Sequence, residues 1–301
     1  TALAVEWARN EAPMVIGVAK QTPWIRPEQR KGLKSKEQEE KESQVWLNTL
    51  KDIGRPPSGC QWISVGDRGN DIYDYAIGAG DEGWDFVVRA KHDRTVVVDG
   101  NKARLKAWIR GLQPQGNYTL DLRARGEKFS RILELKVSWG QALLQPPQSK
   151  TGNSLLVTYV RAYDPEDKDV EWILVTTLEV ASVEDALTVV QIYEDRWIIE
   201  EYHKCLKTGC RIEDAQLKTG KRLLALLGIL GVVAIELLRL RDLSRQEPDR
   251  PAKDVVEKEV IEIVRVKYNL NGEISLRELW RRIAMLGGFL GRKSDGNPGW
   301  Q

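Results

Sequence analysis

Two apolar runs at the start of the chain alternate in the way that β-strands do. They cover residues 1–7 and 14–25, and the turn-forming tract RNEAP lies between them, so a hairpin is predicted. A charged stretch follows, and from about Lys36 to Asp52 the pattern predicts a helix. The tract GRPPSG after it contains the residues that end helices.

The next segment mixes strands and helices and then changes character. A short apolar run at 62–65 predicts a buried strand, 66–71 a tight loop, 72–80 a helix and 84–90 another strand. Between about 93 and 180, Val, Thr and Leu alternate with polar residues in short runs, which predicts consecutive antiparallel strands.

The last third of the chain is predicted to be helical. The expected helices cover about residues 183–208, 221–243, 253–267 and 275–286. The apolar run from Leu223 to Ile235 is shorter than the roughly 20 residues that cross a bilayer, and we interpret it as a buried core helix. Mixed α/β units interrupted by an all-β stretch predict an α/β domain with a β-rich insertion.

Composition narrows the function only slightly. Of 301 residues, 42% are hydrophobic and 30% are charged, which fits a globular protein and excludes a disordered one. The net charge is +2, so a nucleic-acid partner would have to be bound by local basic patches. The three cysteines, Cys60, Cys205 and Cys210, suit a reducing cytoplasm. His203, Cys205 and Cys210 lie close together in the sequence, but a typical zinc site needs four well-spaced ligands.

One side of the helix predicted at 183–208 carries an acid among several cations and a tyrosine. At about 100° per residue, a stripe about 60° wide contains Tyr193, Arg196, Glu200 and Lys207, with Lys204 and His203 beside it. The opposite arc, expected to face the core, contains Ile198, Ile199, Tyr202, Cys205 and Leu206.

The stripe has two interpretations. A carboxylate could bind a metal ion while Arg and Lys hold phosphates. The alternative is a solvated face with ion pairs one turn apart, such as Glu200 with Lys204, and geometry alone favours it. A second acid, Asp67, follows the predicted strand at 62–65 in the loop GDRG. Ligands gather at such strand ends in α/β sheets, although aspartate is also common in ordinary turns.

Taken together, these segments resemble one family. The spacing Tyr193-x2-Arg196-x3-Glu200-x6-Lys207 is similar to the Y-R-E-K signature of the insertion-sequence-four, or transposon-five-like, DDE transposases. Further similar segments are WIRP at 24–27, KESQVW at 41–46, VGDRGNDIYDY at 65–75, FVVRAKHDR at 86–94 and LGGFLGRKSDGNPGW at 286–300. The resemblance covers essentially the whole chain.

The resemblance implies a ribonuclease-H-like mixed sheet that contains a β-rich insertion domain and is followed by C-terminal helices. Its parts would be residues 1–92 and 181–243 for the core, 93–180 for the insertion and 244–301 for a truncated helical region. The implied chemistry is metal-dependent DNA strand cleavage and strand transfer at transposon ends, in a cut-and-paste mechanism that uses two Mg²⁺ or Mn²⁺ ions.

Residue roles carry over position by position. Asp67 matches the second catalytic, metal-binding acid and Glu200 matches the third. The residues that match DNA contacts are Tyr193, Arg196, Lys207, Arg68, Arg89, Lys91, His92 and Trp172, and Lys204 beside the stripe is expected to join them. Trp172 matches a tryptophan that stacks near a flipped base, with a plain strand-core role as the alternative.

One departure from the family concerns the first aspartate. The family carries it on a strand that precedes the hairpin, whereas no Asp precedes Asp52 here, and Glu6 lies on the wrong strand. We therefore expect a fragment, cut at both ends, that is inactive by itself and poorly stable. Losing a central strand would leave the edges of its two neighbours unpaired.

Three functional hypotheses remain. The first is a transposase acting on double-stranded DNA as a homodimer, in the prokaryotic cytoplasm at the nucleoid and without a membrane. The second is a catalytically dead DNA-binding or dimerising remnant, or an inhibitor, which the missing aspartate favours. The third, a ribonuclease-H-like repair nuclease, explains the acids but not the Tyr–Arg–Lys stripe.

Overall fold

The computed structural model of the chain describes residues 1–22, 35–122, 131–292 and 294–300, with the backbone alone at 35–43 and 122. The WIRP segment at 24–27 lies outside the described residues. The chain divides into two compact units. Trp24–Trp197 form the larger one, and Thr1–Pro23 with Ile198–Gln301 form the smaller one.

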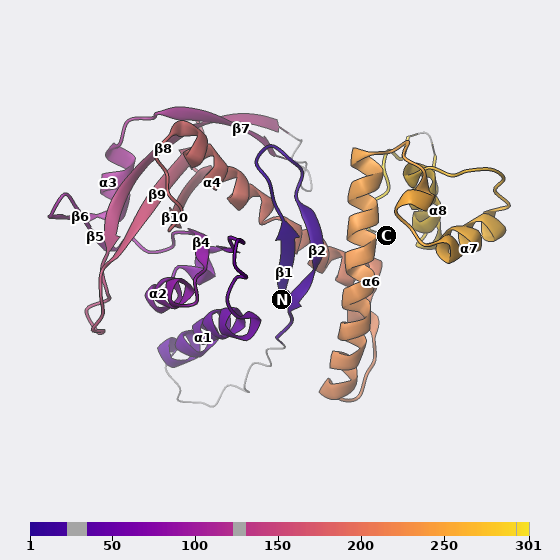
Figure 1. Ribbon diagram of the computed structural model, residues 1–301, viewed down its shortest axis with the longest axis horizontal. Helices are drawn as coiled ribbons and strands as arrows, with labels where there is room; N and C mark the ends of the chain where they lie inside the picture. The colour runs from indigo at the N-terminus through magenta and orange to yellow at the C-terminus, as the bar shows by residue number, and fades with distance from the viewer. Residues whose placement is uncertain (23–34, 123–130, 293, 301) are drawn as a thin grey trace. The chain divides into compact units, whose positions relative to one another are not determined.

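The larger unit is built on one mixed sheet (Figure 1). Its strands lie in the order β3 (Ile63–Gly66), β4 (Asp85–Arg89), β10 (Glu171–Thr176), β9 (Leu155–Tyr163), β8 (Arg131–Leu144), β5 (Thr95–Val98) and β6 (Asn101–Arg104), with β7 (Gly116–Leu122) on β8. The β3–β4 pair is parallel and the other pairs are antiparallel. The predicted α/β class with a β-rich stretch is therefore confirmed. The limits 93–180 for an insertion stay a prediction, because β10 continues the same sheet into β4.

Helices cover both faces of this sheet. They are α1 (Ser35–Ile53), α2 (Tyr73–Asp81), α3 (Leu105–Gly111) and α4 (Val183–Asp195). Phe86 and Val88 of β4 join a buried cluster with residues of α2 and α3. Val87, which points the other way, is fully buried on the face that α4 contacts. Side-chain alternation along one strand thus supplies two cores.

Two helices of the larger unit differ from the prediction. The helix α3 was not predicted at all, because seven residues inside a β-rich stretch are too few for a periodicity signal. The helix expected at 183–208 begins where predicted, with a capping box between Ser182 and Asp185. It ends at Asp195, where Arg196 and Trp197 form tight i→i+3 hydrogen bonds instead of helical ones.

The smaller unit contains the hairpin and the remaining helices. Strands β1 (Ala2–Glu6) and β2 (Met14–Lys20) pair antiparallel, which confirms the predicted hairpin. The helices are α5 (Ile198–Lys204), a π-turn at Cys205–Gly209, α6 (Gly220–Gln246), α7 (Lys258–Tyr268) and α8 (Leu276–Leu286). Helix α6 contacts both β2 and α8, and its inner side belongs to the buried cluster of this unit.

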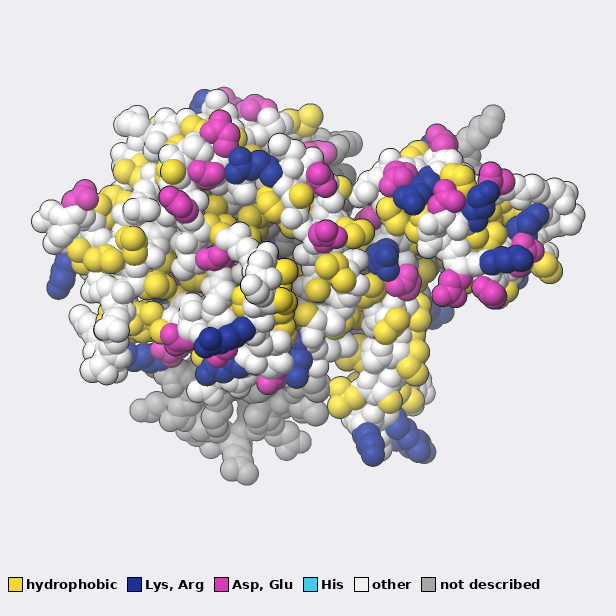
Figure 2. All heavy atoms as spheres, viewed as in Figure 1, with side chains coloured by type: hydrophobic (Ala, Val, Ile, Leu, Met, Phe, Trp, Pro, Cys, Tyr) yellow, Lys and Arg dark blue, Asp and Glu magenta, His cyan; other side chains and the backbone are white. Residues whose placement is uncertain are grey.

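The prediction that Leu223–Ile235 is a buried core helix is wrong for most of this run. Ala234 and Ile235 are buried, but Ile229 is 66% exposed and Val232 is 65% exposed. Figure 2 shows hydrophobic side chains along the open side of α6. Apolar residues surround the helix, whereas neighbours from the described part of the chain pack against only one side of it. By length and composition α6 is the one described helix that could cross a membrane, which is weak evidence because core helices of soluble proteins pass the same test.

Candidate metal and nucleic-acid site

Polar groups collect where the parallel strands β3 and β4 end. Gly66 pairs with Val88, so Asp67, directly after β3, and Arg89, the last residue of β4, lie at the same edge of the sheet. Strand β10 runs antiparallel to β4 and begins at this edge with Glu171 and Trp172. The carboxyl ends of parallel strands are where α/β sheets bind ligands.

The Asp67 carboxylate is held at the surface by its own turn. Its Oδ1 accepts a hydrogen bond of 2.7 Å from the Gly69 amide, and the residue is exposed. The chain turns so sharply after Gly66 that a Cβ atom on this residue would lie 2.6 Å from the side chain of Asn70. Only glycine allows that approach. The turn therefore fixes one carboxylate oxygen and leaves the group in solvent.

The other acid of this loop, Asp71, is used inside the fold. Its side chain is buried and accepts hydrogen bonds from the backbone amides of Lys91, at 2.6 Å, and His92, at 3.0 Å. It also forms an ion pair with Arg94. Asp71 thus ties the loop after β3 to the loop after β4 and presents Lys91 and His92, both exposed, at the strand ends. Sequence reasoning missed this residue, because two acids in one turn look alike without their partners.

A closed ring of contacts joins four residues at this edge. The Arg89 guanidinium donates to the Glu171 carbonyl at 2.7 Å and contacts the Tyr193 hydroxyl. The Trp172 ring packs edge-on against the Tyr193 ring, with centroids 5.1 Å apart. Tyr193 is only 6% exposed, so its ring is packed, unlike the open stripe that the sequence suggested. The helix periodicity gave no sign of Trp172, which lies on a distant strand.

Several positive charges surround this ring. Burial lowers the pKa of the Arg89 guanidinium, and the nearby charges of Arg68 and Arg196 act in the same direction. The Arg196 guanidinium also lies 5.8 Å from the centre of the Tyr193 ring. Three arginines held together in this way are unfavourable by themselves and are stabilised by an anion.

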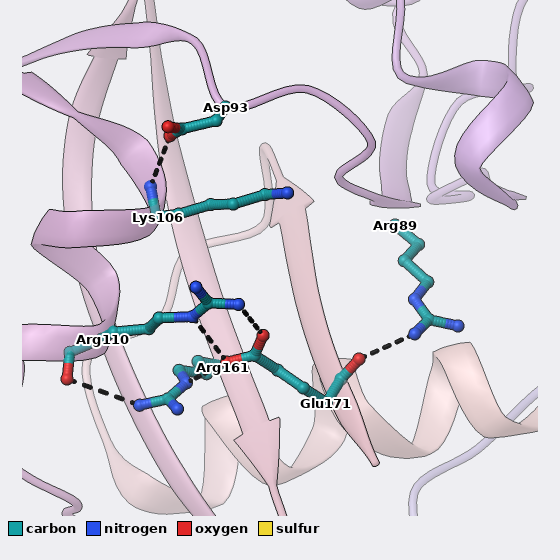
Figure 3. A network of polar contacts seen from close by, with 6 residues as sticks. All are labelled: Arg89, Asp93, Lys106, Arg110, Arg161 and Glu171. Carbon is teal, nitrogen blue, oxygen red and sulfur yellow. Dashed lines mark hydrogen bonds and ion pairs between the residues drawn. The ribbon is translucent and has the colours of Figure 1, made fainter. Parts of the chain in front are cut away.

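Glu171 supplies the negative charge for a second pair of arginines next to Arg89 (Figure 3). Its carboxylate accepts hydrogen bonds from Arg110 at 2.5 and 3.1 Å and from Arg161 at 2.8 Å. Burial raises the pKa of the Glu171 carboxyl, but the two arginines outweigh burial and leave that pKa below its ordinary value. Sequence reasoning missed Glu171, since its partners come from α3 and β9.

The smaller unit repeats the contrast between one used acid and one exposed acid. Glu201 forms an ion pair with the buried Arg241 and accepts a 3.1 Å hydrogen bond from the Trp300 indole. Its neighbour Glu200 is exposed on α5. Of the predicted cations in this unit, Lys204 is exposed and Lys207 lies in the π-turn, 3.1 Å from Glu213.

The predicted inner arc of this helix is confirmed. Tyr202, Cys205 and Leu206 are buried, and Ile198 and Ile199 pack against the same cluster. Burial raises the pKa values of the Cys205 and Cys210 thiols. Both groups are therefore neutral thiols near neutral pH.

The donor chemistry of the predicted acids suits hard divalent ions, because carboxylate oxygens are the ligands that Mg²⁺ and Mn²⁺ prefer. No group of three His, Cys, Asp or Glu side chains gathers in the described part of the chain. Asp67 belongs to the larger unit and Glu200 to the smaller one. Their joint role as metal ligands stays a prediction.

The two acids of the first loop should differ sharply in their effect on stability. We expect Asp71→Asn to lower the free energy of unfolding by about 3 kcal/mol, because it leaves Arg94 without its buried partner. Asp67→Asn should change it by less than about 0.5 kcal/mol, since its side chain is solvated. Urea unfolding of both variants measures this difference, and equal losses would contradict the roles assigned to the two acids.

The Glu171 cluster should make stability depend on pH. Because its pKa is lowered in the folded protein, the carboxylate contributes stability that is complete above the unfolded-state value of 4.5 and is lost as pH falls through the folded-state value. We expect the stability advantage of the parent chain over Glu171→Gln to be constant near neutral pH and to shrink in acid. Thermal unfolding of both proteins from neutral to acid pH measures this advantage. An advantage that grew in acid would disprove that the two arginines stabilise the Glu171 carboxylate.

A comparison with known families identifies the family of the chain. The family model described as the transposase DDE domain matches residues 37–235. The match includes the whole edge of the sheet around Asp67 and Arg89, the α4 segment with Tyr193 and Arg196, and the α5 segment with Glu200. The chain belongs to the transposase DDE domain family.

Proposed function

We propose that this chain is the catalytic region of a cut-and-paste transposase that resembles the Y-R-E-K group and that cleaves and joins DNA at transposon ends. The proposal rests on one pattern that occurs in two segments of the chain. Asp71 and Glu201 are consumed by internal bonds, while Asp67 and Glu200 beside them are exposed. An exposed carboxylate is accessible to an external cation, and its oxygens are the ligands that Mg²⁺ and Mn²⁺ prefer.

In this proposal, Asp67 and Glu200 are ligands of the same two Mg²⁺ or Mn²⁺ ions. When bound, such a pair of ions activates the attacking oxygen and stabilises the leaving oxygen of a phosphodiester. The chain's own contribution at Asp67 is positional, because the Gly69 amide fixes one carboxylate oxygen before any ion binds. Fixing ligands in advance reduces the cost of ordering them on binding.

The cations at the strand ends would hold the DNA backbone. Arg68, Arg89 and Arg196 together carry three positive charges next to Asp67, and Lys91 and His92 lie on the anchored loop beside them. Phosphate oxygens would relieve the mutual repulsion of these arginines and accept bidentate hydrogen bonds. Lys204 and Lys207 would add contacts from the smaller unit.

Trp172 is suited to stacking on an extruded base. It is partly exposed, and the edge-on contact with Tyr193 fixes its ring. Stacking on an aromatic ring contributes about 1–3 kcal/mol per base, which is comparable to the few kcal/mol that unstacking costs. Tyr193 then acts from a packed position, by orienting Trp172 and Arg89.

We further propose that the 301-residue chain does not turn over by itself. The resemblance implies three carboxylates, and no Asp precedes Asp52 in the chain. The same observation favours the second function, a DNA-binding and dimerising remnant or inhibitor. The two are distinguished by the reading frame upstream of Thr1, which in an intact transposase encodes a strand bearing an aspartate.

Cleavage is tested with a labelled duplex that carries the element's end, in Mn²⁺. We expect no cleavage by the 301-residue chain and clear cleavage by a protein extended with an upstream aspartate-bearing strand. In that longer protein, Asp67→Asn or Glu200→Gln should lower the rate at least about 1,000-fold, because each removes a metal ligand.

Asp81→Asn is the matched control for this experiment. Asp81 is exposed at the last residue of α2, away from the strand ends, so its variant should cleave at the parent rate. Turnover by the 301-residue chain would contradict the proposal that it is inactive by itself. An unaffected Asp67→Asn variant would contradict the proposed site.

The Tyr193 hydroxyl should matter for DNA binding although it is packed. We expect Tyr193→Phe to weaken duplex binding roughly two- to tenfold, because Arg89 loses one hydrogen bond of about 0.5–1.5 kcal/mol that orients it. Tyr73→Phe is the control, since Tyr73 is 7% exposed and its hydroxyl donates to the Asn153 carbonyl instead. Fluorescence anisotropy compares the two variants, and equal affinities would disprove a role for Tyr193.

A further inference from the structure

Helix α3 carries two cations that the predicted site does not include. Lys106 and Arg110 lie one helical turn apart and therefore leave α3 on the same side, as Figure 3 shows. Among the described residues the Lys106 ammonium makes no hydrogen bond or close ion pair, and its backbone amide donates to Asp93 at 2.9 Å. These charges come from the helix that the sequence did not predict.

Arg110 connects this helix to the strand ends. Its guanidinium donates to the Glu171 carboxylate through Nε and Nη2, while the carbonyl of the same glutamate accepts from Arg89. Arg110 and Arg89 therefore bind the side chain and the backbone carbonyl of the same residue. Of these two arginines, Arg110 belongs to α3 and Arg89 ends β4, directly beside the loop of Asp67.

The charge balance of this cluster leaves an excess of positive charge. One carboxylate, Glu171, is shared by Arg110 and by Arg161, whose side chain is only 12% exposed. Arg161 satisfies the glutamate from inside, and Arg110 remains 51% exposed. Its third guanidinium nitrogen, Nη1, is not engaged by Glu171. Asp93 also lies near Lys106 and Arg110, so the three cations Lys106, Arg110 and Arg161 face two carboxylates, and the surface of α3 keeps about one net positive charge.

We propose that Lys106 and Arg110 form a second DNA-backbone contact, which binds phosphates of the duplex next to the segment held at Arg89 and Asp67. The proposal deepens the proposed function and rests on it. Contacts to phosphates position the protein on the duplex and carry no sequence information directly. We therefore expect the contact to be independent of sequence and to add affinity along the flanking duplex.

The structure favours duplex DNA over an acidic protein segment as the partner. The α3 cations lie next to the Arg89, Arg68 and Arg196 cluster, so together they form a run of positive charge along one edge. A double helix offers a phosphate every 3.4 Å of rise on each strand, which matches an extended run better than a single acidic side chain does.

The test measures DNA binding as a function of salt for the double variant Lys106→Gln with Arg110→Gln. Each phosphate contact contributes about 0.9 to the slope of log affinity against log salt concentration. We expect the variant to lose between about 1 and 2 from that slope, equally on random duplex and on duplex bearing the element's end.

The matched control is Lys51→Gln with Arg55→Gln. This pair has the same residue types, the same spacing and the same change in net charge. Arg55 bonds the carbonyl of Asp81, ahead of the start of β4, which is the opposite end of the strand from Arg89. The control should keep the parent slope, and thermal unfolding of both variants checks that each is folded at the temperature of the binding measurement.

A third arm, Arg196→Gln, separates this inference from the proposed function. If Arg196→Gln loses slope while the α3 variant matches its control, the α3 contact is overturned and the proposed function stands. If the parent chain shows no salt-dependent binding to duplex DNA, both fail. A loss of slope in the α3 variant on DNA, with no loss in the Lys51 and Arg55 control, supports the contact.

Discussion

The buried carboxylate of Asp71 holds the candidate site together. Strands β3 and β4 are hydrogen-bonded along their length, but the loops that follow them have no sheet to order them. Asp71 joins those loops, because it lies in the first and accepts two backbone amides and an arginine from the second. Two of the three donors are backbone amides, so the Asp71 side chain is the residue on which the link chiefly depends. The exposed groups Asp67, Lys91 and His92 depend on it for their positions.

The contrast between Asp71 and Asp67 is one of energy. A carboxylate buried away from water is stable only if hydrogen bonds and an opposite charge replace its hydration, and Asp71 has both. Asp67 keeps most of its hydration and gains little from the fold, so the fold has no need of its charge. In the smaller unit, Glu201 is likewise bonded inside the fold, while its neighbour Glu200 is exposed.

Sequence patterns predicted the elements whose partners are local. The hairpin, the strand–loop–helix–strand order around Asp67 and the buried arc with Tyr202 all follow from periodicity within one element. Three features escaped it. The helix carrying Lys106 and Arg110 is short and lies among strands, and the break after Asp195 involves no glycine or proline. The open side of α6 depends on where its neighbours stop.

The same limit applies to the site. Asp67, Arg68 and Arg196 could be selected from residue type and spacing, because their chemistry is visible in the chain itself. Tyr193 was assigned to an open stripe, yet its environment is set by Trp172 on β10, which helix geometry cannot register. Glu171 was not selected, because a lone glutamate at the start of a strand has no signal until Arg110 and Arg161 are placed beside it.

The Glu171 cluster also bears on the role of the β-rich stretch. Its carboxylate accepts hydrogen bonds from Arg110 of α3 and Arg161 of β9. Its carbonyl accepts one from Arg89 of β4. One residue therefore connects that stretch to the edge that carries Asp67. Strand β10 continues the connection through the sheet, and Trp172 continues it through Tyr193 to α4. A spacer between two catalytic segments would need none of these bonds. In the proposed function, the β-rich stretch therefore forms one wall of the DNA-binding surface, because Glu171 binds the arginines of that stretch as well as Arg89 at the end of β4.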